Sequence, residues 1–191
     1  RERHSREAAR RLAYLPQSRA VPSITARRMV LHGRFPYLSY PRRYRREDYE
    51  AVDRALRLAD ALELADRPLP ELSGGQRQKV YLAMALAQET ETILMDEPTT
   101  YLDIRRQLET LRLVRRLAEE GRAVALVLHD LCLALTTADD VAVLGEGRLL
   151  ALNGPEEIYR SRVLDRMMGV RLDRAAGPGG WRYFCELPEE G

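Results

Sequence analysis

In the middle of the chain, short apolar runs alternate with a longer amphipathic segment, and this alternation limits the possible folds more than any other feature. The runs Thr92–Met95, Ala123–Leu128 and Val141–Leu144 have the length and composition of buried strands. Between the first two, Ile104–Glu120 places apolar residues at helical spacing. Strands that alternate with helices in this way form a parallel sheet covered by helices, so the sequence predicts an α/β fold.

The segments on either side of this core follow other patterns. Leu12–Leu15 predicts one further strand, whereas residues 23–90 are mainly helical in periodicity, most clearly over Glu47–Leu64 and Ser73–Gln88. We interpret this stretch as a helical subdomain inserted into the core. Beyond the core, the pattern predicts a strand at Arg148–Leu152, helices at Pro155–Tyr159 and Ser161–Met168, a linker at Gly177–Gly180 and a strand at Trp181–Leu187.

Composition narrows the class of protein. No apolar run approaches the roughly 20 residues that cross a bilayer, so we expect no membrane span. The two cysteines, Cys132 and Cys185, show no disulfide framework and no metal-site spacing, and we expect two reduced thiols. The net charge is +2, but residues 1–49 contain 13 arginines against four acidic residues. Such a basic segment is typical of contact with nucleic acid, an anionic membrane surface or an acidic partner.

Four short motifs suggest a phosphate and metal site. Leu72–Gln76, Leu-Ser-Gly-Gly-Gln, combines a helix N-cap with two glycines that let a ligand approach the backbone, although alone it is equally well a capped turn. Asp96 and Glu97 follow an apolar strand, where Asp96 can hold Mg²⁺ and Glu97 can polarise a water molecule. His129 and Gln17 also follow strands, in reach of a terminal phosphate or metal.

Together these motifs resemble the ATP-binding subunits of ABC transporters. In chain order, the family's Q-loop, signature, Walker B strand, D-loop and switch histidine match Tyr14–Gln17, Leu72–Gln76, Ile93–Glu97, Tyr101–Asp103 and His129. The resemblance implies a RecA-like P-loop NTPase core with the helical subdomain inserted after the Q-loop. It also implies ATP and Mg²⁺ as cofactors, and a head-to-tail dimer in which each signature faces ATP held by the other subunit. Further implied partners are a transmembrane permease and, indirectly, a substrate-binding protein, at the cytoplasmic face of the membrane; no nucleic acid is expected.

The family's roles carry over to the matching residues. Glu97 would be the general base, and His129 would sense the γ-phosphate. Asp96 would support Mg²⁺, while Gln17 would contact Mg²⁺ and the attacking water. The nucleotide would also be contacted by Ser73, Gly74, Gly75, Gln76 and Asp103. The expected division is 1–16 for a core strand, 17–90 for the helical subdomain with the signature, 91–160 for the catalytic core and 161–191 for a C-terminal helix and tail.

Four further segments narrow the resemblance to ATPases that import ferric siderophores, haem or cobalamin. They are Gly33–Tyr37, Ala65–Leu69, Glu97–Ile104 and Gly154–Ile158. These residues are typical of a family branch rather than of its chemistry. The substrate itself is chosen by the permease and its binding protein, so the sequence names only the branch.

The family's phosphate-binding loop, Gly-x-x-x-x-Gly-Lys-Ser/Thr, is absent from these residues. The only lysine is Lys79, which lies inside the predicted signature helix. The aromatic loop that stacks on adenine and the strands before the Q-loop are also absent. Because Glu97 and His129 are intact, we expect a chain truncated before the Q-loop rather than a decayed ATPase.

Other interpretations of the sequence stay open besides the transporter subunit. Chromosome-organising ATPases place long coiled-coil arms between Gln17 and Ser73, where this chain has 56 residues and no sustained heptads. A translation-associated ABC ATPase with two cassettes and a non-catalytic regulatory fragment are two alternatives. A nucleic-acid-binding module is the third, because arginines alternate with aromatic residues over 34–46.

The missing lysine loop leads to the first prediction. We expect the 191-residue chain alone to bind Mg-ATP too weakly to be useful and not to hydrolyse it, because no lysine is placed to hold the β- and γ-phosphates. Isothermal titration of the chain with Mg-ATP measures this directly. Micromolar affinity would contradict the prediction.

Overall fold

The structure is a computed structural model that describes residues 2–17, 21–100 and 102–188. The chain divides into two compact units, Arg1–Val127 and Leu128–Gly191. Within the described ranges, no helix combines the length and the apolar character that crossing a membrane requires. The division into four segments expected from the sequence stays a prediction.

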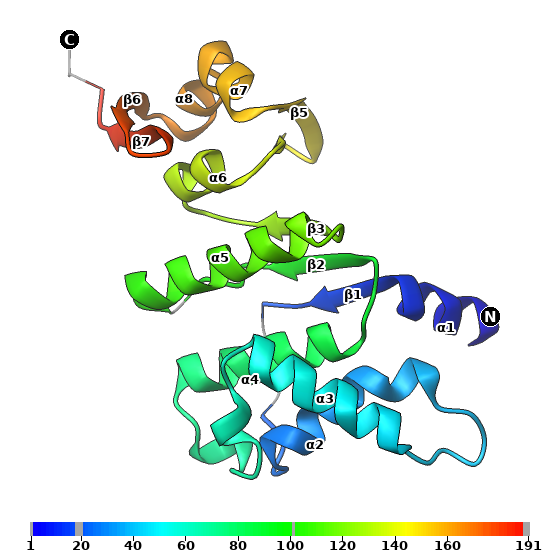
Figure 1. Cartoon of the computed structure of the whole chain (residues 1–191). Helices are drawn as coiled ribbons and strands as arrows, with labels where there is room; N and C mark the ends of the chain where they lie inside the picture. The colour runs from blue at the N-terminus through cyan, green and yellow to red at the C-terminus, as the bar shows by residue number, and fades with distance from the viewer. Residues whose placement is uncertain (1, 18–20, 101, 189–191) are drawn as a thin grey trace. The chain divides into compact units, whose positions relative to one another are not determined.

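The first unit contains one sheet and most of the helices (Figure 1). The sheet is parallel, in the order β1-β2-β3, as predicted for the first two apolar runs. The third run, Val141–Leu144, is instead part of β4 (Val141–Gly145), which pairs antiparallel with β5 (Arg148–Asn153). The elements in chain order are α1 (Glu2–Arg11), β1 (Leu12–Leu15), α2 (Ala26–Leu31), η1 (His32–Tyr37), α3 (Arg46–Leu58), η2 (Leu62–Leu64), η3 (Leu69–Glu71), α4 (Gly74–Ala87), β2 (Thr92–Asp96), α5 (Ile104–Glu119) and β3 (Ala123–Val127), where η marks a 3-10 helix.

The register of the sheet decides where the site can form. Leu15 of β1 pairs with Met95 of β2, and Asp96 pairs with Val127 of β3. Because the strands are parallel, their carboxyl ends lie at one edge of the sheet. The residues that follow β1 and β2 therefore leave the sheet side by side, although about 80 residues separate them in sequence.

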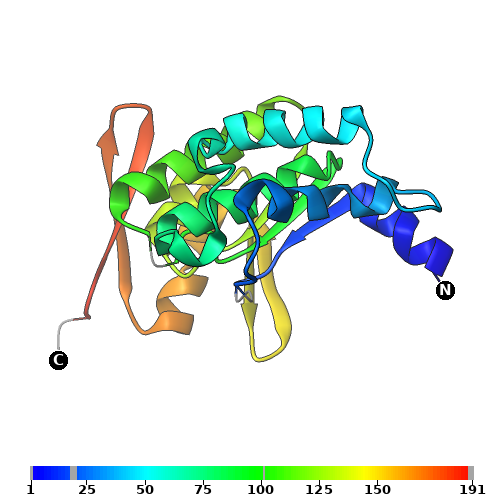
Figure 2. The same ribbon diagram turned by 90° about the horizontal axis from the view of Figure 1, so that it is seen from below.

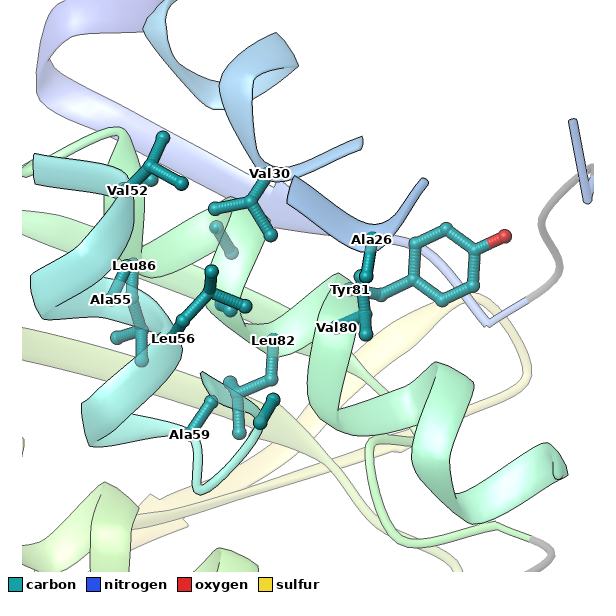
Figure 3. Packing of buried hydrophobic residues seen from close by; sticks show 14 of the residues in the cluster. Ala26, Val30, Val52, Ala55, Leu56, Ala59, Val80, Tyr81, Leu82 and Leu86 are labelled. Carbon is teal, nitrogen blue, oxygen red and sulfur yellow. The ribbon is translucent and has the colours of Figure 1, made fainter. Parts of the chain in front are cut away.

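The helices α2, α3 and α4 pack together around a shared apolar core (Figures 1 and 3). Figure 3 shows side chains from all three helices converging, with Val30 from α2, Leu56 from α3 and Val80 from α4 fully buried. At Gly33 the chain lies so close to α4 that a Cβ atom would come 2.2 Å from the carbonyl oxygen of Met84. This contact fixes η1 against the helix that carries the signature.

The second unit consists of two antiparallel hairpins and three short helices. Its elements are α6 (Leu131–Thr137), β4 (Val141–Gly145), β5 (Arg148–Asn153), α7 (Pro155–Ser161), α8 (Val163–Met168), β6 (Arg171–Gly177) and β7 (Gly180–Glu186). β6 and β7 form a long hairpin, drawn orange to red in Figure 2. A separate apolar cluster holds this unit together, built on Leu135, Val143, Ile158, Leu164 and Leu172.

The α/β fold class is confirmed, while two elements were not predicted and two further local predictions are wrong. The pattern predicts neither α1, which has no apolar stripe, nor β6, whose only fully buried residue is Leu172. The expected linker Gly177–Gly180 is the turn of the β6–β7 hairpin, since Gly177 pairs with Gly180. The helix expected over Glu47–Leu64 ends at Leu58, because Asp60 adopts a left-handed conformation with φ of 51°.

A buried arginine joins three parts of the helical region. Arg34 is only 7% exposed, and its guanidinium lies 4.1 Å from the centroid of the Tyr37 ring. Its Nε donates to Asp48 at 3.1 Å, and its Nη1 donates to Glu89 and to the carbonyl oxygen of Ala87, both at 2.8 Å. This single side chain therefore connects η1, α3 and the segment after α4.

Glu89 depends on that arginine for its charge. Burial alone would raise the pKa of Glu89, but a hydrogen bond from Arg54 and the charge and hydrogen bond of Arg34 hold this pKa below its ordinary value. A carboxyl group with a lowered folded pKa stabilises the fold at neutral pH and loses this contribution as acid protonates it. The ion pairs of Glu89 therefore weaken in acid, as pH falls through its folded pKa.

We predict that Arg34→Met lowers the free energy of unfolding by about 3 kcal/mol, because it leaves buried Asp48 without its cation. The matched control is Arg46→Met, whose ion pair with Glu50 is formed by a side chain that is 92% exposed. We expect that change to stay within about 0.5 kcal/mol. Urea unfolding followed by circular dichroism measures both; equal losses would contradict the role given to Arg34.

Candidate functional site

The two carboxylates follow each other where the chain leaves β2. Asp96 is the last residue of β2, and the backbone N–H of Glu97 donates to the carbonyl oxygen of Val127 at 3.1 Å. Glu97 has a φ of 48°, a left-handed conformation that is strained for a residue with a side chain. Such strain costs about 1–3 kcal/mol and collects at functional sites. The backbone is thus held in an unusual turn at the predicted base.

Side chains from the end of β1 and from the loop after β2 meet at these carboxylates. Nε2 of Gln17 and Oγ1 of Thr100 both donate to Oε2 of Glu97, the latter at 2.9 Å. Oη of Tyr14 donates to Oδ2 of Asp96 at 3.3 Å. All three of these donors are neutral, and their hydrogen bonds orient the two carboxylates. The structure thus brings Gln17 to Glu97, while the base and metal roles stay predictions.

The donor types at this edge suit a magnesium ion. Mg²⁺ is bound in proteins through one or two carboxylates together with water and substrate phosphates, rather than by a full cage of side chains. Among the described residues, no group of three or more His, Cys, Asp or Glu side chains forms a metal site. Asp96, with the amide oxygen of Gln17, provides the sparse oxygen set that such an ion uses.

The signature residues form the start of α4. Ser73 is the N-cap: its Oγ accepts from the backbone N–H of Gln76 at 3.3 Å, and Oε1 of Gln76 accepts from the N–H of Ser73 at 3.0 Å. This capping box fixes the first turn of a 14-residue helix. Ser73 and Gly74 are exposed, whereas Gly75 is buried.

Gly75 has a specific neighbour that the motif alone does not reveal. A Cβ atom at Gly75 would lie 2.2 Å from Nη1 of Arg106, so only glycine lets that guanidinium lie against the helix. Arg106 also pairs with Asp103 at 3.3 Å, and Asp103 caps α5 by accepting from the N–H of Arg106 at 3.0 Å. Asp103 and the signature are therefore linked through one arginine; Tyr101 of the predicted D-loop lies outside the described residues.

A second contact joins α4 to the loop that follows the carboxylates. Nε2 of Gln78 donates to the carbonyl oxygen of Pro98 at 2.8 Å. A cavity of about 290 Å³ lies beside this contact, between α4, α5 and the loop. Lys79, on the same helix, forms an ion pair with Asp60, consistent with its exclusion as a phosphate-loop lysine.

Sequence reasoning did not identify Tyr14, Gln78, Thr100 or Arg106. Arg106 could have been identified from the sequence, because it stands three residues after Asp103. Side chains at this spacing contact each other on a helix. Tyr14 and Gln78 contact residues that lie 82 and 20 positions away in the chain, and Thr100 contacts Glu97 across a local turn. A single sequence has no signal for these contacts.

His129 belongs to the second unit, two residues after β3 ends and next to Asp130. Its side chain is exposed, and Asp130 caps α6 by accepting from the N–H of Leu133 at 2.9 Å. His129 thus follows the end of a strand, as the sequence predicts. The approach of His129 to a phosphate in the first unit stays a prediction.

Comparisons with known proteins agree with these motifs. A family model described as "ABC transporter" matches residues 1–100. The ferric enterobactin transport ATP-binding protein FepC of Escherichia coli is 43% identical over 169 residues, covering 87% of this chain and 62% of that protein. The hemin import ATP-binding protein HmuV of Rhodococcus jostii is 46% identical, covering 85% and 56%. The petrobactin import ATP-binding protein FpuD of Bacillus anthracis is 40% identical, covering 91% and 64%.

The chain thus spans less than two thirds of the length of these relatives. Among solved structures, an inward-facing ABC transporter described as metal-chelate type matches 93% of this chain and 72% of that one, with a TM-score of 0.83 and 24% identity. An ATP-binding cassette with bound ADP and Pi, in a post-hydrolysis state, matches 81% of this chain and 67% of that one, with a TM-score of 0.69 and 24% identity. At this identity the likeness shows the fold alone.

The capping box leads to a prediction about the signature helix. We expect Ser73→Ala to lower the free energy of unfolding by about 1 kcal/mol, because the N–H of Gln76 loses its acceptor. Ser73→Asp should retain most of the stability, since a carboxylate also caps a helix. Urea unfolding followed by circular dichroism compares the three proteins; a loss as large in Ser73→Asp as in Ser73→Ala would contradict the capping role.

Proposed function

Because this chain belongs to the ABC transporter family, we propose that it is the signature-bearing and catalytic part of an ATP-hydrolysing subunit that drives import of an iron siderophore or haem. The observation that carries the proposal is the meeting of Gln17 and Glu97 at the carboxyl edge of a parallel sheet. The named importer ATP-binding proteins that resemble the chain support the transport role.

In the proposed mechanism, the residues of this chain mainly position and polarise. Glu97 accepts a proton from the attacking water, held in place by Gln17 and Thr100. Asp96 and the Gln17 amide oxygen would hold Mg²⁺, which neutralises phosphate oxygens when bound. His129 would contact the γ-phosphate. Lys79, the only lysine among these 191 residues, lies inside α4 and is paired with Asp60, so we assign it no role in phosphate binding.

The signature would act on a nucleotide held by a second subunit. Ser73 and Gly74 are exposed at the start of α4, where backbone N–H groups and the helix dipole favour anions. In such a site neither subunit is complete alone, so hydrolysis depends on closure of the pair. The assembly proposed is a head-to-tail dimer on a transmembrane permease at the cytoplasmic face of the membrane.

The contacts in the basic segment weigh against the nucleic-acid alternative. Arg42 lies over the ring of Phe35 at 4.6 Å, and Arg34 lies over Tyr37 at 4.1 Å. Each of these rings already has a guanidinium of the same chain on one face. A base-stacking platform needs such faces open, so this segment is better suited to the protein and lipid surfaces beside a permease.

The proposal is tested in a protein that joins these 191 residues to a P-loop-bearing N-terminal segment. We expect Glu97→Gln to lower ATP turnover at least about 100-fold while ATP binding is kept, because it removes only the proton acceptor. The control is Glu63→Gln, at an exposed position in η2 far along the chain from the motifs, which should leave turnover unchanged. Coupled-enzyme turnover and nucleotide titration separate the two quantities. Unchanged turnover in Glu97→Gln would remove this residue from the base role.

A further inference from the structure

The second unit brings the two cysteines of the chain together. Cys132 lies in the first turn of α6 and Cys185 lies near the end of β7. They are 53 residues apart in sequence, yet their Sγ atoms are 3.9 Å apart. This distance is about twice the length of an S–S bond, which is about 2.05 Å. The two sulfur atoms must therefore approach each other by about 1.9 Å for a bond to form.

The packing of α6 against the hairpin holds the thiols in this position. Leu135 of α6 belongs to the same apolar cluster as Leu172 of β6, and Tyr183 of β7 packs against it. Alternate residues of a strand face the same side, so Cys185 lies on the face of β7 that carries Tyr183. The core of the unit therefore presents Cys185 to α6, and the contact of the thiols follows from buried neighbours.

We propose that Cys132 and Cys185 are a redox-sensitive pair that forms a reversible intramolecular disulfide by exchange with a small-molecule disulfide. The thiolate of Cys185 attacks the reagent and forms a mixed disulfide, releasing one thiol. The thiolate of Cys132 then attacks Sγ of Cys185, forming the protein S–S bond and releasing the second thiol. Both cysteines are oxidised, the small disulfide is reduced to two thiols, and the two cysteine protons end on those thiols.

The order of the two attacks follows from the surroundings of each thiol. Cys185 is exposed, whereas Cys132 is half-buried. Burial, followed by the neighbouring Cys185 and the charge of Asp130, raises the pKa of Cys132 to about 12. The exposed Cys185 therefore meets the reagent first. Cys132 is held beside it and loses its proton only as it attacks the mixed disulfide as the resolving thiol.

The bond would fix α6 to the C-terminal hairpin. Cys132 lies in α6, which is only seven residues long. The N-cap of α6 is Asp130, which directly follows His129. A covalent tie at Cys132 thus limits the movement of the segment that carries the switch histidine. That consequence for ATP hydrolysis rests on the proposed function, whereas formation of the disulfide does not.

The test uses the full chain, purified in reducing buffer and then incubated with oxidised glutathione. Intact-mass measurement without reductant should show a monomer lighter by two hydrogens, with no free thiol, and reduced glutathione should restore the original mass. Because the chain has only two cysteines, this mass change identifies the bond. A wild-type protein that accumulates only glutathione adducts, or only disulfide-linked dimers, would overturn the proposal.

Two variants and one dynamic measurement complete the test. In Cys132→Ser, the reaction with oxidised glutathione should stop at the mixed disulfide on Cys185. In Cys185→Ser, the remaining thiol should react with oxidised glutathione at least tenfold more slowly than the wild-type protein does. In the oxidised wild type, the backbone amides of Leu131–Thr137 should exchange with deuterium more slowly than in the reduced protein. Equal exchange in both forms would refute the clamp on α6. None of these measurements involves ATP, so their failure is distinguishable from failure of the proposed function.

Discussion

The parallel pairing of β1 with β2 is the contact on which the site depends. It places Leu15 opposite Met95, and the next residues of each strand therefore emerge together. Gln17 reaches Glu97 only because of this register, since a shift of one residue would send their side chains to opposite faces. The third strand completes the arrangement, because Val127 accepts the hydrogen bond that holds Glu97 in its left-handed turn.

The helix that begins at the signature, α4, connects this edge of the sheet to other parts of the first unit. Gln78 ties α4 to the loop after Glu97, and Gly75 gives room to the arginine that pairs with Asp103. These contacts are short and specific, so a displacement of the first turn of α4 has to change the loop or the pairing of Arg106. These contacts therefore form a continuous path from α4, which begins at the signature, to the loop that follows Glu97.

The sequence predicts best those features that depend on residues close together in the chain. The helix cap at Ser73 was predicted, because its side chain bonds only three residues along the chain. Asp103 and Asp130 cap α5 and α6 through the same local contact, which was not predicted for them. The hairpin turn at Gly177–Gly180 and the meeting of Cys132 with Cys185 depend on strands and helices that pair across the fold. Glycine-rich composition favours a linker and a tight turn alike, so only the pairing of β6 with β7 decides between them.

The charges of the side chains at the site decide which part of phosphate binding this chain can provide. Asp96 and Glu97 accept hydrogen bonds from the neutral side chains of Tyr14, Gln17 and Thr100, which orient the two carboxylates. The only lysine is paired with Asp60, and Arg106 is paired with Asp103. A nucleotide's phosphates carry several negative charges, which adjacent carboxylates repel unless cations intervene. Because Lys79 and Arg106 each already pair with a carboxylate, phosphate binding beside Asp96 and Glu97 needs positive charge from other groups.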